Sequence, residues 1–304
     1  MNEVLYKRIT REYDDRVYKR KPAKGSLIIE FENIINNSDN LVVEFDGYII
    51  PVDGSKVTLL FYCREYNREL SNTLELRDLA NLLFTELKKE VDFDLAEKLA
   101  NKFKCSLACV FSPYDYPLNE KEVKEDKIIV FPYIEKKKVL KLMNIEKFRN
   151  LLLNHRKRTT KKPLVFASTK LEYYLAKIPL GQKTTIAFPG DADGILLDKN
   201  HNILAIFEYK SDTYGKNISE ENILKYKEDV NKFRVLDDLC KMVSVPLVVI
   251  FWSDTHTKCK IIIRNSFNGK EISFILSANS YIDLASDLNN SLKNLKNFTD
   301  KLKS

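Results

Sequence analysis

The chain has 304 residues, 44% of them hydrophobic and 31% charged, with 8 glycines and 9 prolines, a globular composition that excludes collagen-like and disordered classes. The formal net charge is a modest +7, and no apolar run approaches the ~18 residues that span a bilayer, which predicts a soluble, cytoplasmic protein. The five cysteines are irregularly spaced, which argues against a zinc site or a disulfide framework and favours reduced thiols.

The first half of the chain has the pattern of an α+β domain. Residues 26–63 are rich in β-branched and aromatic side chains separated by Asn, Asp and Gly, which predicts strands. Leucines follow at helical spacing over residues 73–103, and then come two strand-like runs and a short helix. These patterns predict a separate α+β domain over residues 1–154, with a role in recognition, regulation or partner contact.

Residues 155–163, with the sequence HRKRTTKKP, are basic and polar, contain no acid and end in proline. They predict a linker between two domains. Runs of this kind suit phosphate contacts, because neutralising phosphates releases condensed counterions; the alternative is a solvated linker without a partner. The candidate nucleic-acid-binding residues in this run are Arg156, Lys157, Arg158, Lys161 and Lys162.

The second half, residues 164–304, reads as an α/β domain. Its patterns predict a helix at residues 168–178, three strands, a long helix at residues 219–243 and a strongly apolar strand at residues 246–252. Two more strands and an amphipathic helix follow. No internal repeat is evident in the sequence.

Charged side chains crowd the ends of two apolar runs, GILL and NILAIF, in this second half. A hairpin centred between Asn200 and His201 would place Asp193 opposite Glu208, with Lys210 on the same face of the sheet. Buried carboxylates repel unless a cation lies between them. If no cation is bound, neutralising one of the two carboxylates should leave the stability of the protein unchanged or raise it. A salt bridge to Lys210 without a metal is the alternative and predicts the opposite sign.

Oxygen ligands of this kind suit a hard divalent cation, so the predicted metal is Mg²⁺, with Mn²⁺ able to substitute. Asp193 and Glu208 would bind it together with the backbone carbonyl of Tyr209. A metal there lowers the pKa of a bound water, and Lys210 can orient that water or neutralise developing charge. The candidate catalytic residues are therefore Asp193, Glu208 and Lys210.

The motif P-G-D-A-D followed by E-Y-K resembles the PD-(D/E)XK nuclease superfamily. The order helix, three strands, helix, strand over about residues 163–252 is also similar to the core of that family, which implies a restriction-endonuclease-like fold. Asp191 competes with Asp193, because the family's proline normally precedes its acid directly. The resemblance also implies a metal-binding Glu on the first core helix, for which Glu172 is the candidate, and an auxiliary cation on the later helix, for which Lys225 is the candidate. A solvated helix residue and a surface lysine are the respective alternatives.

This resemblance implies a Mg²⁺-dependent endonuclease that hydrolyses DNA phosphodiester bonds, as restriction, mobile-element and defence nucleases do. One alternative is a non-catalytic nucleic-acid-binding or assembly protein with a degenerate nuclease fold, and another is an RNA nuclease. Double-strand cleavage needs two active sites or two sequential nicks, so a homodimer is compatible with an endonuclease function.

Overall fold

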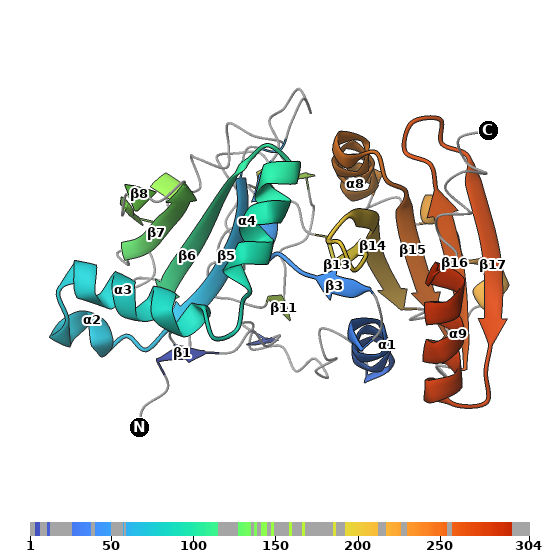
Figure 1. Ribbon diagram of the computed structural model, residues 1–304, viewed down its shortest axis with the longest axis horizontal. Coiled ribbons are helices and arrows are strands. Elements are labelled where there is room, and N and C mark those ends of the chain that lie inside the picture. The colour runs from blue at the N-terminus through green and yellow to red at the C-terminus, as the bar shows by residue number, and fades with distance from the viewer. Residues whose placement is uncertain are drawn as a thin grey trace. The chain divides into compact units, whose positions relative to one another are not determined.

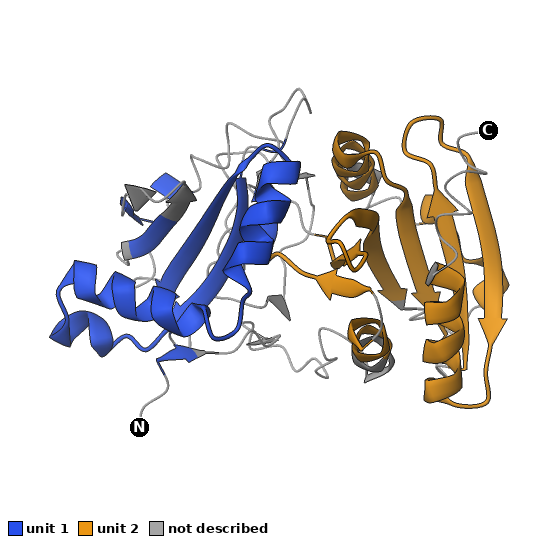
Figure 2. Ribbon diagram, in the orientation of Figure 1, with its two compact units in different colours: residues 1–23, 46–190 blue, residues 24–45, 191–304 orange. Residues whose placement is uncertain are grey.

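A computed structural model describes residues 4–6, 11–12, 26–37, 40–49, 57, 59–114, 127–134, 137–138, 141–144, 147–148, 158–159, 166–167, 185–186, 192–211, 217–225, 230–253 and 257–293. The chain forms two compact units (Figure 2). Unit 1 contains residues 1–23 and 46–190, and unit 2 contains residues 24–45 and 191–304. The predicted linker at residues 155–163 therefore falls inside unit 1, and a segment from the first half of the chain joins the C-terminal unit.

Unit 1 is built on a mixed sheet in the order β1-β5-β6-β7-β8, with β4 paired to β5 and β9 to β7. The strands are β1 (Leu5–Tyr6), β4 (Gly47–Ile49), β5 (Leu59–Tyr66), β6 (Ser106–Pro113), β7 (Lys127–Ile134), β8 (Lys137–Lys138) and β9 (Lys141–Asn144). Two further strand pairs are β2 (Arg11–Glu12) with β11 (Phe166–Ala167), and β10 (Arg158–Thr159) with β12 (Thr185–Ile186).

Three helices connect β5 to its parallel neighbour β6, and they are α2 (Leu70–Thr73), α3 (Leu76–Leu87) and α4 (Phe93–Lys102). The leucine spacing predicted this helical segment, and Asp92 caps α4 by accepting from Leu95 N. Phe84 of α3 packs 4.9 Å, centroid to centroid, from both Phe93 and Phe131. The helices thus cover one face of the sheet with an aromatic core.

Unit 2 is a six-stranded sheet in the order β17-β16-β15-β14-β13-β3 (Figure 1). The strands are β3 (Leu41–Val43), β13 (Gly194–Leu197), β14 (Ile203–Ser211), β15 (Leu247–Trp252), β16 (Lys258–Arg264) and β17 (Glu271–Ser277). The helices are α1 (Ser26–Asn36), η1 (Ile218–Glu220), η2 (Ile223–Lys225), α8 (Val230–Val243) and α9 (Tyr281–Lys293). Among the described strands of this sheet, only β14 and β15 pair in parallel.

The two faces of the unit 2 sheet have different covers. Phe31 of α1 and Leu284 of α9 belong to one buried cluster with alternate residues of β14 and β15, such as Phe207 and Val248. α8 covers the opposite face, where Lys232 and Phe233 approach side chains of β14. Glu208 and Lys210 therefore lie on the α8 face, and Tyr209 lies on the α1 face.

The prediction of a strand at residues 26–35 is wrong, because this segment is helix α1. Isoleucine and phenylalanine favour strands, but here the apolar residues also recur at three- and four-residue spacing, which favours a helix. Phe31 and Ile35, one helical turn apart, are both fully buried. Within the described part of the chain, no helix combines the length and the apolar character needed to cross a membrane.

Candidate functional site

The hairpin of β13 and β14 has the register predicted from the sequence. Gly194 pairs with Phe207 and Leu196 with Ala205, and a bulge follows at Leu197. The turn is held by Asp198, whose Oδ1 accepts from the backbone N–H groups of the second and fourth residues after it. This Asx-type arrangement explains why a polar DKNHN loop joins two apolar strands.

Asp193 lies immediately before β13 and uses its carboxylate to extend the hairpin. Its backbone N donates to Phe207 O at 3.1 Å, and its Oδ2 accepts from Tyr209 N at 2.7 Å. The side chain thus takes the place of a strand carbonyl just before β13 begins. Asp193 and Glu208 occupy neighbouring positions, but the Asp193 carboxylate is held beside the backbone of β14 and makes a contact that the sequence did not predict.

Glu208 lies between two ammonium groups on the α8 face of the sheet. Its side chain is 1% exposed, with Oε1 2.9 Å from Lys210 Nζ and Oε2 2.8 Å from Lys232 Nζ. Both lysine side chains are also mostly buried, at 15% and 13% exposure. The Lys210 ammonium additionally lies 5.7 Å from the centre of the Phe233 ring, within cation–π range.

Tyr209 points to the opposite face and ties β14 to α1. Its hydroxyl donates to Glu32 Oε1 at 3.1 Å. Burial, and then the nearby carboxylates of Glu32 and Asp193, raise the pKa of Tyr209 well above its usual range, so it stays protonated. Glu32 therefore contacts the E-Y-K segment from the first helix of unit 2, through the tyrosine.

The oxygens that could hold a hard cation here are the carboxylates of Asp193 and Glu208 and the backbone carbonyl of Tyr209. Their chemistry fits Mg²⁺ or Mn²⁺, but two ammonium groups already neutralise Glu208. Among the residues that the structure describes, no three His, Cys, Asp or Glu side chains are grouped to hold a metal ion. A cation at this position would have to compete with a lysine for Glu208, and its remaining ligands would come from water or a bound phosphate.

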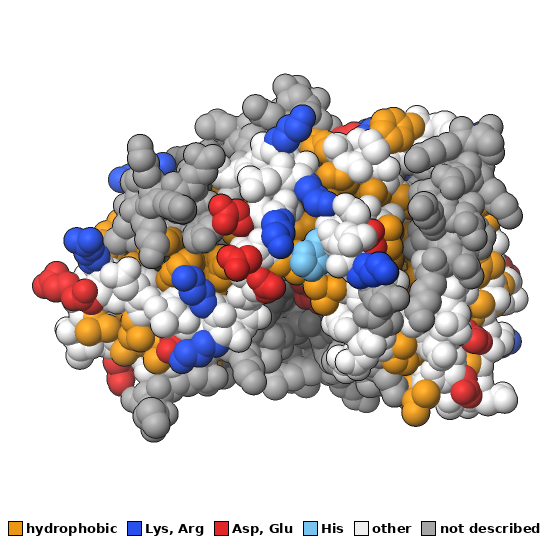
Figure 3. Space-filling model, viewed as in Figure 1, with side chains coloured by type: hydrophobic (Ala, Val, Ile, Leu, Met, Phe, Trp, Pro, Cys, Tyr) orange, Lys and Arg blue, Asp and Glu red, His pale blue; other side chains and the backbone are white. Residues whose placement is uncertain are grey.

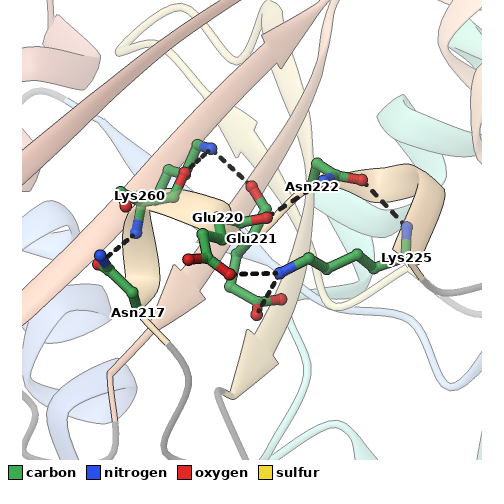
Figure 4. A network of polar contacts seen from close by, with 7 residues as sticks. Asn217, Glu220, Glu221, Asn222, Lys225 and Lys260 are labelled. Carbon is green, nitrogen blue, oxygen red and sulfur yellow. Dashed lines mark hydrogen bonds and ion pairs between the residues drawn. The ribbon is translucent and has the colours of Figure 1, made fainter.

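Lys225, the predicted auxiliary cation, lies in η2, where its ammonium is 3.4 Å from Glu221 Oε1 and 3.9 Å from Glu220 Oε2 (Figure 4). The helix lysine that reaches Glu208 is Lys232, in the first turn of α8. Sequence reasoning missed Lys232 because it expected one long helix from residue 219. The structure has two short 3-10 helices before α8, which alters which residues share a face.

Several predicted site residues, namely Glu172, Asp191, Arg156, Lys157, Lys161 and Lys162, lie outside the described residues, and for Arg158 only the backbone, in β10, is described. Their roles remain predictions. On the face drawn in Figure 3, basic side chains of the described residues are interspersed with acidic and apolar ones.

Neither a protein-family model nor a curated protein matches this sequence. A solved structure, described as the crystal structure of Sex pheromone staph-cAM373 precursor, is similar over 83% of this chain and 93% of its own. The identity is 9% and the TM-score is 0.20, a likeness that carries no argument about fold or function.

Proposed function

We propose that this protein is a divalent-metal-dependent endonuclease that hydrolyses phosphodiester bonds in DNA, with its centre at the end of β14. The observation that carries the proposal is the buried Glu208 with its two lysines. The backbone N–H of the next residue, Tyr209, donates to the Asp193 carboxylate. An acid, a second acid and a lysine are the residue types that the resemblance implies for a nuclease centre. A buried carboxylate with specific charged partners is also a candidate functional group.

The order of elements in unit 2 supports the same reading. Along the chain it runs α1, β3, β13, β14, α8, β15, which is helix, three strands, helix, strand, with β14 and β15 parallel. This is the order that the resemblance implies for a restriction-endonuclease-like core. The first helix and strand come from residues 26–43, between the two segments of unit 1, whereas the sequence predicted them after residue 163.

The charges of the cluster suit a phosphate together with a cation. Asp193 and Glu208 carry two negative charges, and Lys210 and Lys232 carry two positive charges, so the described cluster is close to neutral. A divalent cation alone would add uncompensated positive charge, and a phosphate alone would add negative charge. A bound DNA phosphodiester, with its one negative charge, offsets half of the charge of the cation, so we expect metal affinity to rise when DNA is bound.

The chemistry is a displacement at phosphorus. A water oxygen bonds to phosphorus, and one phosphorus–oxygen ester bond breaks. The attacking water loses one proton, and the departing sugar oxygen gains one. A bound Mg²⁺ or Mn²⁺ would polarise the phosphate and lower the pKa of water. Lys210 and Lys232 offer ammonium groups to the negative charge that develops on the phosphate oxygens. Glu208 positions both ammonium groups through its ion pairs.

A second candidate is a non-catalytic binding or assembly protein. The observation that favours it is that both oxygens of Glu208 are already paired with lysines at hydrogen-bonding distance. Such a cluster can be structural, although buried ion pairs often contribute little net stability.

Incubation with supercoiled plasmid in Mg²⁺ or Mn²⁺, with EDTA as the control, tests the proposal. We expect metal-dependent strand cutting that Lys210→Met lowers by ~100-fold or more, the scale for losing one charge-stabilising group. Lys241→Met is the matched control, because this lysine lies on α8 and is 43% exposed. Cutting of RNA but not DNA would change the substrate class. A parent protein that cuts neither would leave the non-catalytic candidate.

A further inference from the structure

Unit 1 repeats the strand order of unit 2. In unit 1 the hairpin β4–β5 leads through helices to β6, which is parallel to β5, and then to antiparallel β7 and β9. In unit 2 the hairpin β13–β14 leads through helices to β15, which is parallel to β14, and then to antiparallel β16 and β17. Figure 1 shows both sheets with their connecting helices.

The two hairpins also share an unusual local structure. Asp46 N donates to Phe61 O at 3.1 Å, as Asp193 N does to Phe207 O at 3.1 Å. The Asp46 Oδ2 accepts from Cys63 N at 2.6 Å, as Asp193 Oδ2 accepts from Tyr209 N at 2.7 Å.

A glycine follows each of these aspartates and pairs with the phenylalanine, Gly47 with Phe61 and Gly194 with Phe207. A Cβ added to Gly47 would lie 2.5 Å from the Phe61 ring, and one added to Gly194 would lie 2.8 Å from Val42, so a larger residue at either position would displace the neighbouring side chain. The aspartate and the amide it binds are 17 residues apart in unit 1 and 16 in unit 2. The chain between each glycine and its paired phenylalanine is one residue longer in unit 1 than in unit 2.

This alignment places Tyr62 and Arg64 of unit 1 at the positions of Glu208 and Lys210. Both pairs face the helices that connect the parallel strands. Tyr62 packs 6.0 Å from the Phe93 ring of α4, where Glu208 instead pairs with Lys232 of α8. An aromatic contact in unit 1 thus takes the place of a carboxylate–ammonium contact in unit 2.

The charged residues of the unit 1 site are tied to one another. The Arg64 guanidinium lies 2.7 Å from Asp46 Oδ2 and 3.1 Å from Glu90 Oε2, with 11% and 8% exposure for the Arg64 and Asp46 side chains. A guanidinium keeps its charge at any accessible pH, so it neutralises the carboxylates permanently. Burial, and then the Asp46 carboxylate, raise the pKa of Tyr62 well above its usual range, so this position stays uncharged.

We propose that unit 1 is a second copy of the unit 2 core, closed to metal by Tyr62, Phe93 and Arg64, so that each chain has a single cation-dependent centre. The strand order, the aspartate contact and the shared glycine support the relationship between the two units. The presence of Tyr62 and Arg64 at the positions of Glu208 and Lys210 supports the closure of unit 1 to metal. A consequence, which rests on the proposed function, is that one chain cuts one DNA strand per binding event.

Two measurements on the full-length chain test this proposal. The first is Mn²⁺ binding, followed by electron paramagnetic resonance with and without a short DNA duplex. We expect one Mn²⁺ per chain, lost in Glu208→Gln and retained in Asp46→Asn. The second is the time course on supercoiled plasmid, where we expect open circles first and linear DNA only later, with all cutting lost in Lys210→Met.

The outcomes separate the two proposals. Two Mn²⁺ per chain, or one that survives Glu208→Gln and disappears in Asp46→Asn, would overturn the closed-copy proposal even if the plasmid is cut. Residual cutting in Lys210→Met that Asp46→Asn abolishes would do the same. One Mn²⁺ at Glu208 with no cutting of plasmid would support the single centre and count against the nuclease function. Absence of bound Mn²⁺ would contradict both. If a variant fails to fold, the number of Mn²⁺ ions bound per parent chain still tests the closed-copy proposal.

Discussion

Glu208 and its two lysines form a cluster in which each member depends on the others. Glu208 is 1% exposed, so its charge is acceptable there because two ammonium groups neutralise it. The sequence raised the expectation that neutralising one of two crowded carboxylates would relieve repulsion. The geometry reverses the sign, because Glu208 faces cations and Asp193 binds a backbone amide.

We therefore expect Glu208→Gln to lower the free energy of unfolding by about 3–5 kcal/mol in EDTA, because it leaves buried ammonium groups without their partner. Urea denaturation of parent and variant measures this. Glu271→Gln is the control, since this carboxylate pairs with Arg264 at the exposed end of β17 and should cost at most about 1 kcal/mol. Equal stability of parent and Glu208→Gln would contradict the ion-pair geometry. Added Mn²⁺ should stabilise the parent and not the variant.

The sequence identified the residues on one strand better than those brought in from elsewhere. Glu208 and Lys210 are two apart, so the strand period alone places them on one face, and the structure agrees. Lys232 enters from α8, and Glu32 reaches Tyr209 from α1. Those contacts depend on where each helix begins and on which helix belongs to the core. Tertiary packing, and not the local sequence pattern, determines where each helix begins and which helix joins the core.

At the scale of elements, α1 is the largest departure from the sequence prediction. Its isoleucines favour a strand, whereas packing selects a helix, since Phe31 lies 6.4 Å from the Phe207 ring and 6.3 Å from Trp252. Most strands were predictable because alternation or continuous apolar runs mark them, as in β15. The position of β3 beside β13 was not, since unit 1 separates the two strands in the sequence.

If α1 is part of the unit 2 core, Phe31→Ala should destabilise that unit by about 3–5 kcal/mol, the usual cost of emptying a fully buried phenylalanine site. The single tryptophan, Trp252, lies in unit 2 and reports its unfolding by fluorescence. Leu224→Ala is the control, because this leucine of unit 2 is 80% exposed and should change stability by less than about 0.5 kcal/mol. An unchanged tryptophan transition in Phe31→Ala would contradict the placement of α1.

At the scale of the whole molecule, the chain has two cores, and the five thiols are divided between them. Cys63, Cys105 and Cys109 lie in unit 1, and Cys240 and Cys259 lie in unit 2. Burial raises the pKa of Cys105 and of Cys259 to about 12. A raised thiol pKa means that the folded state holds the proton more tightly than the unfolded chain. Each such thiol therefore contributes stability below pH ~9, which is lost as the pH rises towards ~12.

Because the thiolate is the reactive form, all five cysteines should react slowly with a disulfide reagent in native protein at pH 8 and quickly once they are exposed. Each unit has its own core, so we expect the thiols to be labelled in two groups, three from unit 1 and two from unit 2, as urea is raised. Pulsed alkylation followed by mass spectrometry distinguishes the groups. Phe31→Ala should shift the group of two to lower urea and leave the group of three in place. Simultaneous labelling of all five in both proteins would show that the two units unfold as one.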